Sequence, residues 1–365
     1  MIFMLAAAAM MGGMVQPVPL TADRWEIQGE FAFEQRDGRQ VMRLGAPATG
    51  KRGGAVANIK GLDFTTGVIE FDMMLPDVME FSGPMFHQPN ELTGEFIYFR
   101  PHMNGKPDAI QYNPVVNGNL TWQIFTGPGF EAQTTFPLNQ WMRVRVDVYP
   151  ASASVSVDGK PVLAIPDLKN GPLSGLVGFA SLMGGTYFSN VTVEPITGYR
   201  DPSPPPPPKS LADGTIATWQ VSEALIQADA FSRASKSNWT GVPWHAIAVE
   251  TNGIANLSKA GPDGDDEHSF VARFSVRSPA AKSVPMQFGF SDDVRIYLDG
   301  VPLYEGSDRQ NSRDYRFLGH AGFWDTIFLP LKAGTNDIVF VVTDPSNGGT
   351  AAAAIIPPTA GIRVE

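Results

Sequence analysis

The sequence predicts an all-β protein made of two β-sandwich (jelly-roll) domains joined by a polyproline linker. Glycine and proline, which favour turns, number 37 and 31 among the 365 residues. Charged residues make up only 18% of the chain and hydrophobic residues 43%, a balance that favours β-rich globular domains over helices or disorder. Six of the ten residues at 201–210 are proline, and this run divides the chain into two halves, each of the size of one sandwich.

Alternating hydrophobicity and turn residues mark the individual strands. Residues 142–149 alternate strictly, with the valines facing one side and the polar residues the other. The pair Asp158-Gly159 lies between two further apolar runs, and Asp299-Gly300 repeats this arrangement in the second half. Both patterns predict two-residue β-hairpins. Residues 336–343 predict a buried strand, and residues 222–232 are the one stretch that suggests a helix, a short one.

The order of segments predicts export and two domains. We expect a signal peptide at 1–17, the first sandwich at 18–198, a proline-rich linker at 199–211 and the second sandwich at 212–365. The apolar run at 2–11 has the length of a signal-peptide hydrophobic core and is too short to cross a bilayer, although no Lys or Arg precedes it. The protein is therefore expected to be exported, periplasmic or extracellular, without a membrane span. The linker should act as a semi-rigid spacer.

Charge and cysteine content exclude several classes of function. Lys and Arg number 27 and Asp and Glu 37, so the net charge is −10. Without a basic block, the chain is a poor candidate for binding nucleic acid or anionic membrane surfaces. The absence of cysteine from the sequence excludes disulfides, thiolate zinc sites and thiol nucleophiles. The sequence also lacks the phosphate-loop, dinucleotide, nucleophile-elbow and zinc-protease motifs.

Several short segments of the first half occur in a recognisable order. They read GVIEFD at 67–72, EFIYFR at 95–100, AIQY at 109–112, NQWMRVR at 139–145, GLVGF at 175–179 and YFSNVTV at 187–193. In this order they resemble the concanavalin A-like lectin/glucanase superfamily, and most closely its 3-keto-disaccharide hydrolase (family 16 glycoside hydrolase-like) domain. The resemblance implies a two-sheet sandwich that handles carbohydrate. Function, however, must be argued from the site.

Glu70 and Asp72 match the first two carboxylates of the E-x-D-x-(x)-E motif of family 16 glucanases. Positions 74 and 75 are Met and Leu, so the last carboxylate of the motif is missing. Residues two apart share one face of a strand, about 6.6–7 Å apart, which roughly suits paired carboxylates, held at about 5–5.5 Å in a retaining glycosidase. Because Ile69, Phe71 and Met73 form the core face of the strand, we favour the interpretation that Glu70 and Asp72 form its solvated back.

Six residues of the first half form a candidate ligand-binding set. Saccharides need an aromatic platform for their C–H faces and planar donors for their hydroxyls, and Tyr98 and Arg100 share a strand face. The alternative is that Tyr98 and Trp122 are core packing and that Arg100 pairs structurally with an acid. The set consists of Tyr98, Arg100, His102, Gln111, Tyr112 and Trp122.

The second half carries its own set of short segments. They read TWQVS at 218–222, FSDDVRIYLDG at 290–300 and IFLPLKAGTN at 327–336. They resemble the galactose-binding-like jelly-roll modules and the protective-antigen-type carbohydrate-binding fold. Trp324, which lies between Gly-rich turns, joins the candidate ligand-binding set as an aromatic platform, although tryptophan is also common in sandwich cores.

One acidic loop of the second half is the candidate metal site. Its residues are Asp263, Asp265, Asp266 and Glu267. Calcium takes six to eight oxygen ligands, and the resemblance to jelly-roll modules implies a structural calcium. The spacing is not that of an EF-hand, so a solvated acidic loop is the alternative.

These observations predict an exported carbohydrate-binding protein that recognises a poly- or oligosaccharide without catalysis of its own, because the sequence shows no complete catalytic constellation. Two alternatives stay open. One is a glycoside hydrolase or lyase of the 3-keto-disaccharide hydrolase type, with an unassigned acid/base near Tyr98, Arg100 and Gln111. The other is a structural or adhesive surface protein, which an exposed apolar patch would favour. The expected partner is a glycan, and nucleic acid is not expected.

Overall fold

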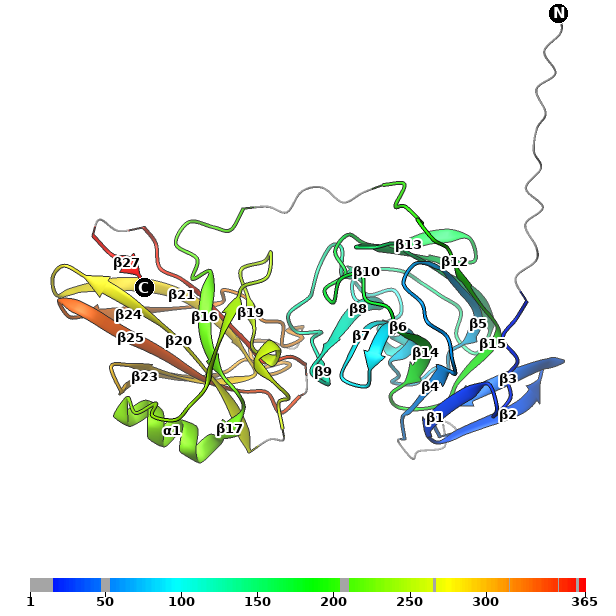
Figure 1. Ribbon diagram of the computed structural model, residues 1–365, viewed down its shortest axis with the longest axis horizontal. Helices are drawn as coiled ribbons and strands as arrows, with labels where there is room; N and C mark the ends of the chain where they lie inside the picture. Colours follow the sequence, from blue (N-terminus) through cyan, green and yellow to red (C-terminus); the bar gives the residue numbers. More distant parts are fainter. Residues whose placement is uncertain are drawn as a thin grey trace, which may run out of the picture.

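The computed structural model describes residues 16–46, 53–203, 210–264, 267–314, 316–346, 348–358 and 361–365. Within these residues the regular secondary structure is almost wholly β-strand, with one α-helix and two short 3-10 helices (Figure 1), which confirms the predicted fold class. No helix in this part of the chain is long and apolar enough to cross a membrane. Most of the predicted signal peptide and the centre of the predicted linker lie outside the described residues, so both stay predictions.

The first sandwich consists of two antiparallel sheets, which we name sheets I and II. Sheet I has the order β1 (Trp25–Gly29), β4 (Ala55–Ile59), β14 (Leu176–Ser181), β6 (Ser82–Asn90), β7 (Thr93–Phe99), β8 (Ile110–Val116), β10 (Glu131–Ala132), with β9 (Asn119–Leu120) also paired to β8. Sheet II has the order β13 (Lys160–Ile165), β12 (Ala153–Val157), β11 (Trp141–Val148), β5 (Gly67–Met74), β15 (Thr186–Pro195), β3 (Arg39–Leu44), β2 (Phe31–Arg36).

Alternation places the core between these sheets. Along β11 the valines are buried, while the polar residues lie on the outer face of sheet II. The hairpin between β12 and β13 turns at Asp158 and Gly159, whose φ angles are 48° and 75°. Asp299 and Gly300 turn the second hairpin with φ angles of 50° and 82°. Positive φ at both central residues is what a type I′ turn requires, so both predicted hairpins are confirmed.

The second sandwich consists of sheets III and IV. Sheet III has the order β18 (Trp244–Ala248), β16 (Thr218–Ser222), β20 (His268–Ser278), β25 (Gly334–Thr343), β22 (Asp293–Leu298), β23 (Val301–Ser307), with β17 (Leu225–Ile226) and β27 (Arg363–Val364) paired to β20. Sheet IV has the order β19 (Ala255–Asn256), β26 (Ala351–Ile355), β21 (Lys282–Ser291), β24 (Asp325–Leu331). The single helix, α1 (Gln227–Lys236), covers the outer face of sheet III.

The predicted helix exists, but its bounds differ from the prediction. The sequence predicted residues 222–232, whereas α1 begins at Gln227. Ser222 ends β16, and residues 225–226 form β17, both of which pair with β20. The first part of the predicted helix therefore forms strands that pair with β20, and only its later part is helical. The helix ends where Ser237 adopts a left-handed conformation with φ of 48°.

One loop of the first sandwich, residues 117–130, enters the second sandwich, and we name it the docking loop. Gln123 at its centre is 1% exposed. Its side-chain Nε2 donates to Oδ1 of Asp292 (2.5 Å) and to the backbone oxygen of Gly319 (2.8 Å). Its backbone nitrogen donates to the oxygen of Gly348 (2.9 Å). This one residue is therefore bonded to three separate segments of the second sandwich.

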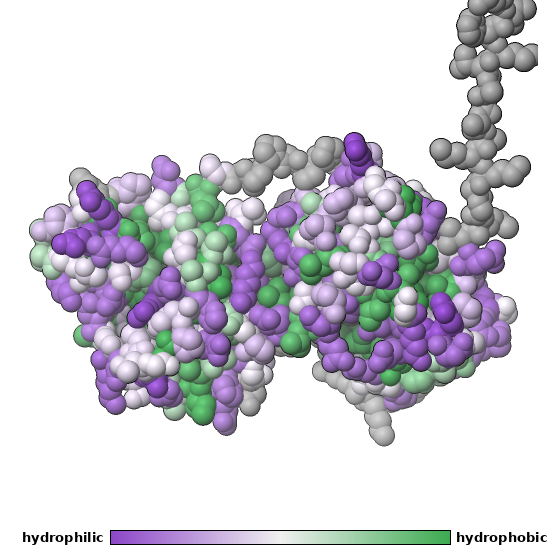
Figure 2. Space-filling model, viewed as in Figure 1, coloured by the Kyte–Doolittle hydropathy of each residue, from purple (hydrophilic) through white to green (hydrophobic). Residues whose placement is uncertain are grey.

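Apolar contacts surround this hydrogen-bonded centre. The buried cluster contains residues of both sandwiches, namely Ile124, Phe125, Ile254, Ala321, Ala351 and Ala353. The alanines of β26 alternate, one pair facing the docking loop and the other the core of the second sandwich, and their small side chains let the loop approach closely. An ion pair of 3.4 Å between Lys169 and Glu250 adds to the contact. In Figure 2 the two sandwiches touch along part of their facing sides.

The sandwiches contact each other directly, apart from the linker. The sequence predicted a semi-rigid spacer between them and left open whether the two domains act together. Hydrogen bonds, buried apolar side chains and an ion pair join the sandwiches without using the linker. Polar contacts between loops carry no periodic signal, so they could not be predicted from the sequence.

We expect the two sandwiches to stay together after the linker is cut. A protease site placed between Ser203 and Ser210 is cleaved, and the product is analysed by size-exclusion chromatography without denaturant. Wild type should elute as one species of full mass. The double variant Gln123→Ala/Phe125→Ala should separate into halves after cleavage, because each buried polar group left unpaired costs about 1–3 kcal/mol and the apolar contact is opened. Separation of the wild-type halves would contradict this account.

Candidate functional site

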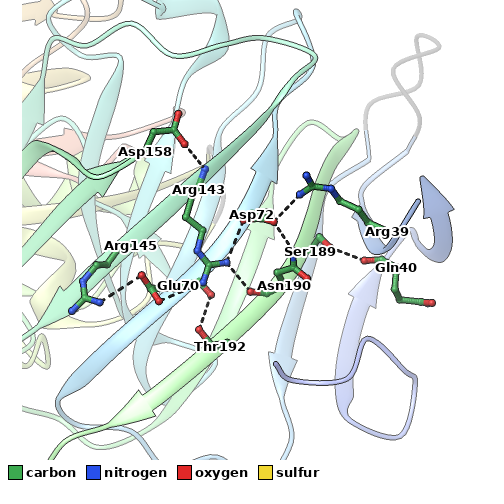
Figure 3. A network of polar contacts seen from close by, with 10 residues as sticks. All are labelled: Arg39, Gln40, Glu70, Asp72, Arg143, Arg145, Asp158, Ser189, Asn190 and Thr192. Atoms are coloured by element: carbon green, nitrogen blue, oxygen red, sulfur yellow. Dashed lines mark hydrogen bonds and ion pairs between the residues drawn. The ribbon is translucent and has the colours of Figure 1, made fainter. Parts of the chain in front are cut away.

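The carboxylates that resemble the family 16 motif lie in an ion-pair network on the outer face of sheet II (Figure 3). Asp72 lies 2.7 Å from Arg39 and 3.2 Å from Arg143. Glu70 lies 3.4 Å from Arg143 and 3.5 Å from Arg145. The apolar residues between them are buried in the core. The structure confirms the favoured interpretation, that this strand presents a solvated, charged back.

Tyr98, Arg100 and Gln111 lie close together, but inside the protein. Tyr98 is 2% exposed, and its hydroxyl donates to Oε1 of Gln111 (2.6 Å). Gln111 Nε2 donates to backbone oxygens of the docking loop, among them that of Trp122 at 3.0 Å. Arg100 forms a buried ion pair with Asp108. Of the two interpretations left open, the structure shows the one in which Tyr98 is packed and Arg100 pairs with an acid.

Tyr112 points to the opposite side of sheet I, into the core. Its hydroxyl donates to Oε2 of Glu95 (2.7 Å) and accepts from the backbone nitrogen of Lys169 (2.8 Å). The backbone nitrogen of Asn170 donates to the other oxygen of Glu95 (3.0 Å). Burial raises the pKa of Glu95 to about 7. Tyr112 therefore holds a loop in place, which corrects its assignment to a ligand-facing surface.

The other three candidates are exposed or half-buried. His102 lies on the 3-10 helix η1 (Pro101–Met103) with its ring edge-on to Phe81, and burial lowers its pKa to about 4. Trp122 is half-buried on the docking loop, and Trp324 is 53% exposed. His320 lies between the two indoles: its ring is 6.2 Å from that of Trp122, and its backbone oxygen accepts from Nε1 of Trp324 (2.8 Å). Candidates from the two halves thus meet where the sandwiches meet.

Two titratable residues that sequence reasoning missed lie at the same place. Glu131 is opposite Gln111 in the register of β8 and β10, and its carboxylate lies 3.7 Å from Nε2 of His320. Burial raises the pKa of Glu131 to about 7 and lowers that of His320 to about 4. No motif marked them, because Glu131 follows a Gly- and Pro-rich stretch and no spacing relates it to His320.

A cleft of about 200 Å³ lies on the outer face of sheet I, towards its β1 edge, and we name it the outer-face cleft. Its apolar part comes from Val56, Met85 and Leu176, together with Pro89. Two hydrogen bonds order its polar part, one from Gln88 to Asn58 and one from Gln28 to Glu91, both 3.1 Å. None of these residues belongs to the set predicted from the sequence. The polar lining residues are Glu26, Gln28, Asn58, Gln88, Asn90 and Glu91.

The outer-face cleft and the Glu131–His320 pair lie at opposite ends of the same face of sheet I. The sheet order takes six steps from β1 to β10, about 29 Å at 4.7–4.9 Å per step. From β6, the lining strand of the cleft nearest to β10, it takes three steps, about 14 Å. Between the two ends, Phe96 and Tyr98 are buried beneath partly exposed apolar side chains. Those side chains include Phe81, Leu120 and Leu182, with Val56 and Met85 on the side of the cleft and Trp122 on the side of the docking loop. The face is therefore apolar in the middle and polar at both ends.

The calcium site stays a prediction. Asp265 and Asp266 lie outside the described residues. Asp263 accepts a hydrogen bond from Oγ1 of Thr350 (2.9 Å), and burial raises its pKa. In the described part of the chain, no three acidic or histidine side chains gather in a way that could hold a metal ion.

No protein-family model matches the sequence, and no curated protein matches it. Several solved structures are similar to about half of the chain. A carbohydrate-binding module, CBM66, from Bacillus subtilis is 15% identical over 48% of this chain and 99% of the module, with a TM-score of 0.37. A β-1,3-1,4-glucanase (lichenase) derived from a mouse hindgut metagenome is 15% identical over 49% of this chain and 96% of its own, with a TM-score of 0.35.

A third similar structure is the potassium-bound carbohydrate recognition domain of Emp46p. It is 11% identical over 47% of this chain and 88% of its own, with a TM-score of 0.34. Carbohydrate-binding modules and family 16 glycoside hydrolases are thus among the structures that the chain resembles, in agreement with the resemblance seen in the sequence. At these identities and TM-scores the likeness assigns neither a ligand nor a reaction.

The buried position of Tyr98 predicts a loss of stability in Tyr98→Phe. The free energy of unfolding, measured by chemical denaturation, should fall by about 1–2 kcal/mol, because the buried amide of Gln111 loses its hydroxyl donor. Tyr187→Phe is the matched control, since that ring lies under the guanidinium of Arg36 on the outer face of sheet II. It should change stability by less than about 0.5 kcal/mol. A Tyr98→Phe protein with the same unfolding free energy as wild type would contradict the hydrogen bond between Tyr98 and Gln111.

The raised pKa of Glu95 predicts a pH dependence of the unfolding free energy that should be absent from Glu95→Gln. Because the folded pKa, about 7, lies above the unfolded value of 4.5, the stability contributed by the protonated form is lost as pH rises through 7. Between pH 5 and 8, wild type should therefore lose about 2 kcal/mol more unfolding free energy than Glu95→Gln. Other titrating groups are common to both proteins and cancel in the difference. Parallel stability curves from urea denaturation would contradict the assignment.

Proposed function

We propose that the protein is a carbohydrate-binding protein, which holds a poly- or oligosaccharide on the outer face of sheet I without transforming it. The outer-face cleft carries this proposal, because it combines amide and carboxylate side chains with apolar ones on a rigid sheet. Saccharides present apolar C–H faces and rims of hydroxyls; in this cleft aliphatic side chains, and not an aromatic ring, provide the apolar contact for the C–H faces. Export, expected from residues 1–17, is part of the proposal.

Two amide side chains lie at the centre of the cleft. Asn58 and Gln88, joined by their 3.1 Å hydrogen bond, together offer donors and acceptors to ligand hydroxyls. Glu26 lies directly opposite Asn58 in the register of β1 and β4. On the other side of Asn58 stands Gly178, where a Cβ would come within 2.1 Å of Oδ1 of Asn58. The glycine therefore leaves the room in which the asparagine side chain lies along the sheet.

The paired carboxylates of sheet II do not support catalysis of the family 16 kind. Arginines flank Glu70 and Asp72 on both sides, and the pair lies on the outer face of sheet II, across the core from the outer-face cleft. The similarity to a carbohydrate-binding module and to a carbohydrate recognition domain agrees with the proposal, which rests on the cleft and not on these likenesses.

Retention on immobilised polysaccharides tests the proposal. We expect the full-length protein to be retained on at least one of mixed-linkage β-glucan, xylan, pectin, levan and starch, and to release no product detectable by mass spectrometry. Asn58→Ala should weaken that retention at least about tenfold, equivalent to about 1.4 kcal/mol, because a ligand hydroxyl loses its amide partner.

Gln35→Ala is the matched control, because it removes an exposed amide from β2 on sheet II. It should bind as wild type does. Retention of Asn58→Ala equal to that of wild type, or no retention of wild type on any of the five polymers, would contradict the proposal.

Glu131 favours a second candidate function, that of a glycoside hydrolase or lyase. With its pKa raised to about 7 by burial, its carboxyl group is partly protonated near neutral pH and is suited to act as a general acid. It stands beside Gln111, where the sequence analysis expected an acid/base that it could not assign. Release of product by wild type, and its loss in Glu131→Gln, would establish this second function and overturn binding without catalysis.

A further inference from the structure

Two tryptophans from different sandwiches contact one histidine. Trp122 comes from the docking loop and Trp324 from the segment that precedes β24, and His320 contacts both. Backbone hydrogen bonds hold the two segments together, since the nitrogen of Ala321 donates to the oxygen of Gln123 (2.9 Å). The relative position of the two indoles is therefore set by the contact between the sandwiches.

The exposed indole is held in a fixed position. Trp324 is 53% exposed, yet its Nε1 is hydrogen-bonded to the backbone of His320. Its ring lies over Gly322, where a Cβ would come within 2.6 Å of the indole. Phe317 contacts the ring edge-on, with ring centroids 6.2 Å apart. A large aromatic side chain ordered before binding loses little conformational freedom when a ligand stacks on it.

Buried polar atoms accompany the indoles. The side chain of Glu131 is 8% exposed, and its Oε1 has no hydrogen-bond partner among the described residues. The same holds for Nε2 of His320 and for Nε of Arg100 and Oδ1 of Asp108 nearby. Leaving such atoms unpaired costs about 1–3 kcal/mol each. A ligand hydroxyl that approaches Glu131 or His320 would give such an atom a partner.

We propose that Trp122, Glu131, His320 and Trp324, which we name the seam site, form a second saccharide subsite that binds an extended glycan chain across both sandwiches. The inference rests on the proposed function and deepens it. The site pairs aromatic surface with unpartnered polar atoms, which is the combination that a sugar ring requires. Because the seam site shares the outer face of sheet I with the outer-face cleft, whose lining strands lie about 14–29 Å from β10, a polymer can contact both, whereas a disaccharide can occupy only one.

The protonation states at the seam site suit a neutral, hydroxyl-rich ligand. Burial keeps His320 uncharged at neutral pH, with a pKa of about 4, and holds the pKa of Glu131 at about 7. The uncharged imidazole and the carboxyl group, which is partly protonated near neutral pH, together offer both a donor and an acceptor. Arg100 and Asp108 balance each other's charge beneath it.

The test compares polymer binding by the full-length protein with binding by tryptophan variants. Affinities for the five polysaccharides named above, and for cellobiose, xylobiose and maltose, are measured for wild type, Trp324→Ala, Trp122→Phe and Trp141→Ala. The last is the matched control, a half-buried tryptophan of sheet II. Trp324→Ala removes an exposed ring, so its folding is not in question, and thermal unfolding checks Trp122→Phe.

We expect both seam variants to weaken polymer binding at least fivefold and Trp141→Ala to leave it unchanged, with disaccharide binding less affected than polymer binding. Polymer binding that Asn58→Ala weakens and neither seam variant changes would overturn the seam site and leave the proposed function standing. Failure of wild type to bind any polymer would overturn both.

Discussion

Gln123 makes the contact on which the arrangement of the whole molecule depends. Its side-chain amide is buried against Asp292 and Gly319 of the second sandwich, where an unpaired amide would cost about 1–3 kcal/mol. Directional hydrogen bonds of this kind allow the docking loop one position. That position buries the neighbouring apolar side chains and brings Trp122 to His320. Two domains that a linker alone would leave to move independently are thereby combined into one surface.

The outer face of sheet I shows how this contact relates to function. An antiparallel sheet packs one face on the core, and its other face must be solvated or covered. Here the middle of that face is covered by its own apolar side chains, and the β10 end lies against the second sandwich through Glu131 and His320. The β1 end remains as a polar cleft. The cleft and the seam site are thus two ends of one face, and this is why we assign them a single extended ligand.

The fold could be predicted from the sequence because its signals are local. Alternation along β11 and the turns at Asp158-Gly159 and Asp299-Gly300 depend on neighbouring residues alone. The same alternation predicted that Glu70 and Asp72 lie on the outer, solvated face of β5. The site could not be predicted, because β7 is buried on both faces, and a continuous apolar run does not reveal which residues face outward. Tyr98 and Tyr112 were accordingly grouped although they lie on opposite faces. Asn58 and Gln88 come together only through sheet order, and a lone loop residue such as Gln123 has no pattern.

The central claim is that both sandwiches contribute to one binding surface, and hydrogen–deuterium exchange tests it most directly. Exchange of the full-length protein is followed by mass spectrometry with and without whichever of the five polysaccharides retains it most strongly. The account predicts slower exchange with the polymer in β4 and β6, in the docking loop and in residues 317–325. Protection confined to sheet II, or to a single sandwich, would contradict it.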